Sequence, residues 1–288
     1  AFHINDFQRR MRAGIFRAPA GAVSLKTFTP APRAGNPPER IAEVPAGVLN
    51  SIGLQNPGKD AFFAQTMPRV LAALERDQIV VSVGGDTIED YVALCRETEA
   101  RFGGRIAALE LNAACPNVSH GAGFYSRDPQ AARELVQAVR EAVVLPVFLK
   151  FNTNFPNYLE VAAAVEAAGA DALYTTNTPL GMKIDLHRRR PALGNGRGPI
   201  CGPAIRPIGV LRTWELYEAV RLPIIASGGI RTWEDAVEYL LAGACAVGVG
   251  SAQFVQPDAA SDILSGLERY AAAEGLECLT PLVGAAHP

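Results

Sequence analysis

The chain lacks the features that mark disulfide frameworks, metal centres and membrane spans. Its 288 residues contain five cysteines and four histidines, all widely separated and without a C-x-x-C pair, so neither a disulfide framework nor a metal site is indicated. No apolar run approaches the ~20 residues that a membrane helix needs. The formal net charge of -2 gives no reason to expect nucleic acid or an anionic membrane as a partner. These absences favour a protein of the reducing cytoplasm that binds small polar metabolites.

The composition is that of one large globular domain. A hydrophobic content of 49% over this length can bury a full core, and no linker or change of composition divides the chain, so we expect a single domain over residues 1–288. The chain begins at Ala1 rather than at methionine, and residues 1–17 are too basic and polar in their middle for a signal peptide. We therefore expect it to be the interior of a longer protein.

Short apolar runs alternate with segments of helical length. The runs are residues 22–26, 79–83, 106–111, 147–151, 172–176, 223–226 and 246–249, and the helical segments between them include 87–101, 129–143, 159–168, 214–220 and 233–242. The runs are apolar throughout, as strands covered on both faces should be, and the alternation predicts a parallel sheet. The sequence thus predicts an α/β (β/α)8 TIM barrel whose first strand is missing from the chain.

Two connections are longer than a barrel requires. Residues 27–58 are rich in proline, glycine and arginine, and residues 183–207 contain three consecutive arginines and the glycines Gly194, Gly196 and Gly198. Both follow predicted strands, which places them on the carboxyl-end face, where barrel active sites lie. We expect both to be active-site loops without regular structure.

Charged and glycine residues end several of the apolar runs. Gly228 and Gly229 follow the sixth run, and Gly250 and Ser251 follow the seventh, where bare backbone N–H groups in barrel loops bind phosphate. Lys26 and Lys150 each end an apolar run, which favours a bound anion or an electron-rich ring. A lysine with a lowered pKa would also suit a Schiff-base lyase, so that alternative stays open.

The third run ends in a thiol among amides. Cys115 lies three residues after Asn112 and two before Asn117, while Asn50 and Asn177 mark other strand ends. An asparagine offers a donor and an acceptor together, which suits a flat ligand with alternating carbonyl and N–H groups, such as a pyrimidine. We expect Cys115 to be the reactive group of this pocket.

Several longer motifs occur in one order along the chain. They are SLKT from Ser24, GNPPER from Gly35, LNSIGLQNPG from Leu49, LNAACPNVSHG from Leu111, NTPLGMKIDL from Asn177 and CGPAIRP from Cys201. Together with the glycine loops they resemble the class 1 dihydroorotate dehydrogenases, which are FMN enzymes of pyrimidine biosynthesis built on a TIM barrel. The GLQNPG and GMKID forms are most similar to the NAD-linked subclass that pairs with an iron-sulfur and FAD subunit.

The resemblance implies oxidation of dihydroorotate to orotate by hydride transfer to FMN, with Cys115 as the base. It implies that substrate is bound by Lys26, Asn50, Ser51, Ile52, Gly53, Leu54, Asn112, Asn177 and Thr178. It implies that FMN is bound by Lys26, Thr27, Asn112, Lys150, Thr176, Gly202, Gly228, Gly229, Gly250 and Ser251, with Lys150 near the flavin N1 edge. It also implies a homodimeric core with the iron-sulfur and FAD electron-transfer subunit as partner.

Three positions depart from the pattern of this family. Ala114 replaces the usual serine before the cysteine, Ser82 replaces an asparagine that meets the flavin, and GPIC at residues 198–201 replaces a more flexible GGLS. Ala114 and the altered loop leave open a flavin-dependent oxidoreductase for another dihydropyrimidine or a small unsaturated acid. The missing first strand leaves open a noncatalytic, partner-binding subunit.

Overall fold

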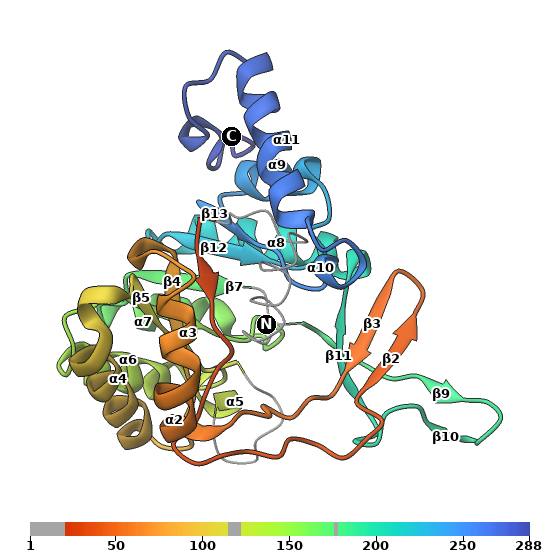
Figure 1. Ribbon diagram of the computed structural model, residues 1–288. Coiled ribbons are helices and arrows are strands. Elements are labelled where there is room, and N and C mark those ends of the chain that lie inside the picture. The colour runs from red at the N-terminus through yellow and green to blue at the C-terminus, as the bar shows by residue number, and fades with distance from the viewer. Residues whose placement is uncertain (1–20, 115–121, 176–177) are drawn as a thin grey trace.

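A strongly curled sheet of seven parallel strands forms the centre of the molecule in this computed structural model, which describes residues 21–114, 122–175 and 178–288 (Figure 1). All seven predicted runs lie in this sheet, so the predicted parallel α/β architecture is confirmed. In spatial order the strands are β1 (Val23–Ser24), β4 (Ile79–Val83), β5 (Ala108–Asn112), β6 (Val147–Lys150), β7 (Ala172–Thr175), β12 (Ile224–Ser227) and β13 (Ala246–Gly248).

Helices connect the parallel strands and cover the outside of the sheet (Figure 1). The predicted helical segment 214–220 was too short, because α8 (Arg206–Ala219) already begins at Arg206. Pro207 lies in its first turn, where a proline is tolerated, rather than in the preceding loop. The helices are α2 (Gly58–Ala61), α3 (Met67–Leu71), α4 (Ile88–Phe102), α5 (Ala122–Tyr125), α6 (Pro129–Arg140), α7 (Tyr158–Ala167), α8 (Arg206–Ala219), α9 (Trp233–Leu241), α10 (Ala252–Val255) and α11 (Ala259–Ala273).

Local sequence fixes where the main helices begin. The Thr87 side chain accepts a hydrogen bond from the Asp90 amide at the start of α4, and Asp90 returns one to the Thr87 amide. Thr232 and Asp235 form the same reciprocal cap at α9. Such caps satisfy amide groups that have no partner within the helix, so each helix begins at a defined distance from the end of the preceding strand.

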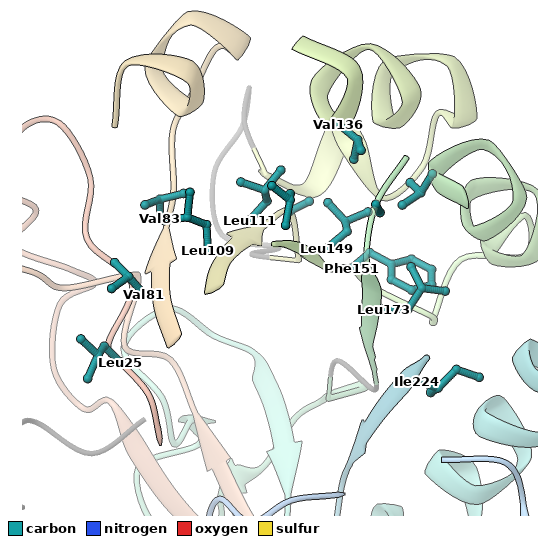
Figure 2. Packing of buried hydrophobic residues seen from close by; sticks show 14 of the residues in the cluster. Leu25, Val81, Val83, Leu109, Leu111, Val136, Leu149, Phe151, Leu173 and Ile224 are labelled. Carbon is teal, nitrogen blue, oxygen red and sulfur yellow. The ribbon is translucent and has the colours of Figure 1, made fainter. Parts of the chain in front are cut away.

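The hydrophobic core lies between the outer face of the sheet and the helices. Leu109, Leu111, Leu149 and Leu173 are fully buried, and they pack with Val136 of α6 in one cluster (Figure 2). Because successive side chains on a strand point to opposite faces, these residues leave the alternate positions of the same strands facing inward.

The inner face of the sheet is more polar than predicted. Glu110 and Ser82 are buried there, whereas Lys150, Tyr174 and Ser227 are only partly buried. The expectation of strands that are apolar on both faces was therefore wrong for this face. Charged and hydroxyl side chains at inner positions are consistent with an active site at the carboxyl ends of the strands, where sites of such folds lie.

The two long connections contain regular structure, contrary to the prediction. β2 (Ile41–Val44) and β3 (Gly47–Asn50) form a hairpin, and β3 pairs with β11 (Gly198–Cys201), which pairs with β8 (Leu180–Gly181). A separate hairpin of β9 (Ile184–Asp185) and β10 (Arg190–Pro191) projects beyond this sheet (Figure 1). Pairing over a long sequence separation, which no local pattern shows, gives these loops their structure.

β1 and β13 are the edge strands of the parallel sheet and do not pair with each other within the described residues. The first 20 residues lie outside the part of the chain that the structure describes. The absence of a first barrel strand therefore stays a prediction.

The packing between the sheet and its helices predicts a large loss of stability for Leu149→Ala. Leu149 is 0% exposed, and truncation of such a residue costs about 2–5 kcal/mol through lost burial and the cavity left behind. Val144→Ala is the matched control, because Val144 is 88% exposed and surface changes stay within about 0.5 kcal/mol. Urea unfolding of both variants checks this, and equal midpoints would contradict the assignment of Leu149 to the core.

Candidate active site

Three polar side chains meet where β5 ends. The Asn112 amide Nδ2 donates to Thr27 Oγ1 at 2.8 Å, and Thr27 Oγ1 is also hydrogen-bonded to Ser82 Oγ at 2.8 Å. The hydroxyl of Tyr91 on α4 donates to the Asn112 carbonyl oxygen at 2.9 Å. The predicted ligand-binding residues Thr27 and Asn112 are therefore in direct contact, although 85 positions separate them in the sequence.

The backbone just before Cys115 is held on three sides. The Ala113 amide donates to the Lys150 carbonyl oxygen at 2.9 Å, and Ser126 Oγ donates to the Ala113 carbonyl oxygen at 2.7 Å. The Ala114 amide donates to Asn112 Oδ1 at 3.3 Å. Cys115 itself lies outside the described residues.

Lys150 ends β6 beside an aromatic ring. Its Nζ lies 4.4 Å from the centre of the Tyr174 ring on β7, a distance at which a cation is attracted to the ring face. Burial lowers the pKa of Lys150, but the charges of Glu110, Tyr174 and Cys201 raise it, and the resulting pKa lies above that of an ordinary lysine. A Schiff-base nucleophile needs a depressed lysine pKa, so the lyase alternative finds no support at Lys150.

Asn50 belongs to the four-stranded sheet and is held there by a hydrogen bond. It ends β3, and its Nδ2 donates to Cys201 Sγ at 3.2 Å on the neighbouring strand β11. Burial raises the pKa of the Cys201 thiol, although hydrogen bonds with Asn50 and Thr178 and the charge of Lys150 oppose that rise. Cys201 therefore lies within electrostatic reach of Lys150 while it orients Asn50.

The loop after β3 is held in a constrained conformation. Gly53 has a φ of +72°, and a Cβ atom there would lie 2.5 Å from the Asn36 amide nitrogen, so only glycine fits. Leu54 adopts a φ of 56°, which is uncommon for a side chain of this kind. Asn36 also donates to Ser51 Oγ at 2.8 Å. Backbone strain of this sort clusters at ligand-binding loops, and residues 51–54 are part of the predicted substrate site.

Two glycine loops close the other side of the sheet mouth. Gly229 follows β12 with a φ of +73°, and a Cβ atom there would lie 2.8 Å from the Gly202 carbonyl oxygen after β11. The Tyr239 hydroxyl donates to the Gly228 carbonyl oxygen at 2.8 Å. Gly250 has open space where a Cβ atom would stand. The glycines at these strand ends therefore permit close approach both to another loop and to a ligand.

A family model described as dihydroorotate dehydrogenase matches residues 9–270. The catalytic subunit of dihydroorotate dehydrogenase B (NAD(+)) of Desulforudis audaxviator, strain MP104C, is 46% identical over 267 residues, which are 93% of this chain and 86% of that protein. The chain belongs to the dihydroorotate dehydrogenase family. The predicted family and its enzyme activity in pyrimidine biosynthesis are confirmed by these matches.

Two further relatives agree with this family membership. The protein of the same description from Enterococcus faecalis, strain OG1RF, is 40% identical over 265 residues, covering 91% of this chain and 83% of its own. A solved dihydroorotate dehydrogenase structure from Eimeria tenella, described as a complex with ferulenol, superposes with a TM-score of 0.76 at 23% identity and covers 92% of this chain and 78% of that one. The structural likeness supports the fold.

Within the described residues of this family member, most of the predicted site residues lie at the carboxyl ends of the sheet strands or in the loops that follow. Cys115, Thr176 and Asn177 lie outside those residues. Sequence reasoning assigned no role to Glu110 or Tyr174, although Glu110 is the one charged residue inside its predicted apolar run of residues 106–111. That charge was the available signal.

The described histidine, cysteine, aspartate and glutamate side chains form no group of three or more that could hold a metal ion. Among the helices placed in the structure, none combines the length and the apolarity that crossing a bilayer requires.

The contacts of Asn112 predict that Thr27→Val destabilises this dehydrogenase fold. Valine keeps the shape of threonine but leaves the Asn112 amide and the Ser82 hydroxyl without the partner that each has at 2.8 Å, which costs about 1–3 kcal/mol for buried groups. Thr27→Ser retains the hydroxyl and should recover most of the loss. Urea unfolding of both variants decides this, and wild-type stability in Thr27→Val would show that the network contributes nothing.

Proposed function

We propose that this chain is the FMN-dependent catalytic subunit of an NAD-linked dihydroorotate dehydrogenase. It transfers hydride from dihydroorotate to FMN and uses Cys115 as the base. The supporting observation concerns three residues that the resemblance assigns to FMN: Asn112 and Lys150 pair at the ends of the neighbouring strands β5 and β6, and Asn112 is hydrogen-bonded to Thr27. The family membership supports the reaction, and the contact between these residues supports their proposed roles.

The residues present fit FMN. Within the described chain, the amides of Gly228, Gly229, Gly250 and Ser251 donate to no backbone oxygen, and free amides in such loops bind phosphate. Lys150 supplies a cation, and Asn112 and Thr27 supply amide and hydroxyl groups for a polar ring edge. When bound, FMN would supply the hydride acceptor. Lys150 is the group that would offset negative charge on the ring.

Dihydroorotate is a ring of alternating carbonyl and N–H groups with a carboxylate. We assign its ring to Asn50, Asn112, Asn177 and Thr178, and its carboxylate to Lys26 and the backbone of residues 52–54. Because Asn50 donates its Nδ2 to Cys201, its Oδ1 is the atom left to accept from a ring N–H group. Ser51 is fully buried and supports the loop through the contact with Asn36.

Cys115 has a suitable chemistry for the base. The reference pKa of cysteine is about 8.5, so thiolate and thiol are both accessible near neutral pH. The thiolate takes the proton from C5 as C6 loses hydride. The three hydrogen bonds on Ala113, Ala114 and Asn112 hold the strand end that delivers it.

The same proposal covers the assembly. The curled seven-strand sheet is the wall of a (β/α)8 barrel in a single FMN-binding domain, working in the cytoplasm. The core is a homodimer, and an iron-sulfur and FAD subunit passes electrons onward to NAD. The description of the relatives as catalytic subunits supports a partner of this kind.

Flavin content tests the proposal most directly. The purified protein, alone or after incubation with FMN, should show the visible absorbance of bound flavin, and dihydroorotate should bleach it under anaerobic conditions. A colourless protein that FMN cannot reconstitute would overturn the proposal. Bound flavin that another dihydropyrimidine bleaches and dihydroorotate does not would instead favour the alternative substrate.

Cys115→Ser should retain FMN but reduce it slowly. A serine hydroxyl is a far weaker base at neutral pH, and a positioned base contributes about 10²–10⁴-fold, so the rate of flavin bleaching in stopped-flow measurements should fall by about that factor. Cys278→Ser is the control, because Cys278 is exposed and should leave the rate unchanged. An unaltered rate in Cys115→Ser would remove this residue from the role of base.

A further inference from the structure

Glu110 is a buried carboxyl group that the reaction described above does not use. It lies on β5, is 3% exposed, and its Oε2 accepts a hydrogen bond from Ser24 Oγ on β1 at 2.9 Å. A buried carboxylate is costly unless donors and an opposite charge offset the loss of water. One neutral hydroxyl donor supplies only part of that compensation, and a neighbouring cation would supply more.

The topology places Lys150 on the same face of the sheet as Glu110. β5 and β6 are parallel neighbours in which Asn112 pairs with Lys150 and Glu110 pairs with Phe148. Residues two apart on a strand share a face, so Glu110 lies on the face of Asn112 and Lys150, diagonally one level deeper. Long side chains at such diagonal positions are within reach of each other. The two opposite charges therefore lie within one inner face.

Three described titratable groups act on Lys150, each from a different strand. They are Glu110 from β5, Tyr174 from β7 and Cys201 from β11. Tyr174 carries a phenol and Cys201 a thiol, which are weaker acids than a carboxyl group. Glu110 is the carboxyl group among them, and it has the largest effect of the three on Lys150.

We propose that Glu110 is a positioning residue that keeps the Lys150 ammonium charged and directed at the flavin-binding mouth of the sheet. This inference rests on the proposed function, because that function places Lys150 at the flavin. Tyr174 lies on β7, the other neighbour of β6, and the centre of its ring is 4.4 Å from Lys150 Nζ. A Cβ atom at Gly248 would lie 2.3 Å from the Tyr174 hydroxyl, so the glycine leaves room for this ring position.

The charge of Lys150 depends on which of two opposing effects dominates. Burial lowers its pKa, and Glu110 is the foremost of the groups that raise it. With Glu110 present, Lys150 stays protonated up to a pH above the ordinary lysine pKa. With Glu110 neutral, burial is opposed less strongly, so the ammonium loses its proton at a lower pH. Loss of that cation makes reduction of a flavin beside it less favourable.

The test is to measure the pKa of Lys150 in Glu110→Gln. The chain has only four lysines, Lys26, Lys59, Lys150 and Lys183, so protein labelled with [13C]lysine gives four side-chain NMR signals, and Lys150→Arg identifies the signal of interest. Glutamine can still accept from Ser24 but has no charge. We expect the titration midpoint of Lys150 to fall by about one pH unit or more, because an adjacent opposite charge shifts a pKa by at least about that much.

Glu97→Gln is the matched control. Glu97 Oε2 lies 2.9 Å from Lys59 Nζ, and its hydrogen bond raises the pKa of Lys59. Glu97→Gln should lower the midpoint of Lys59 and leave that of Lys150 unchanged. If Glu110→Gln does not fold, Glu110→Asp keeps the charge but withdraws it by one methylene, and a smaller decrease at Lys150 is expected.

The flavin gives the second readout. In FMN-loaded Glu110→Gln, the midpoint potential of the flavin should become more negative as pH rises through the lowered Lys150 pKa. The wild type should show no such additional decrease in midpoint potential over that pH range. An unchanged Lys150 midpoint in Glu110→Gln, or in Glu110→Asp where that is the folded variant, would overturn this inference. Failure to bind FMN would instead overturn the proposed function, because the lysine titration does not require flavin.

Discussion

The pleat of β5 is the constraint on which the rest of this structure depends. Leu109 and Leu111 point outward and are fully buried under helices, while Glu110 and Asn112 point inward from the same four residues. A slip of one residue would reverse both sets, placing a carboxylate in the apolar core and leucines at the ligand mouth. The free energy of burying the leucines therefore also fixes the direction of the polar side chains. Stability and the active site are determined by one register.

The second requirement is a connection between the strand ends and the segments that cover them. β3 and β11 are separated by a long stretch of chain, yet they pair side by side and place Asn50 against Cys201. Gly202, directly after β11, lies against Gly229 of the β12 loop. The four-stranded sheet is thus anchored to the parallel sheet at the loop proposed to bind phosphate. A substrate ring held by Asn50 would have its position set relative to the flavin through these backbone contacts.

The sequence was sufficient for the parallel strands because each is a local apolar run, and residues 79–83 coincide with β4. It was also sufficient to predict that Asn112 and Lys150 lie at one edge of the sheet, because the carboxyl ends of parallel strands share that edge. It was insufficient for β2, β3, β8 and β11, whose short pairings form between segments far apart in the chain. It also could not show that Glu110 and Lys150 share a face, since this depends on the register between β5 and β6.

The two departures near the base can be understood from the same contacts. Ser82 stands where the family usually has an asparagine, and it is fully buried and hydrogen-bonded to Thr27. It therefore orients the Thr27 hydroxyl, which accepts a hydrogen bond from Asn112, rather than facing a ligand. Ala114, where a serine is usual, is 2% exposed, and its backbone amide donates to Asn112 Oδ1. Asn112 is therefore held at both ends of its side-chain amide, with donor and acceptor fixed. The orientation of Asn112 depends on Thr27 and on the backbone amide of residue 114, and neither departure removes these partners. The two departures are therefore compatible with the family's reaction.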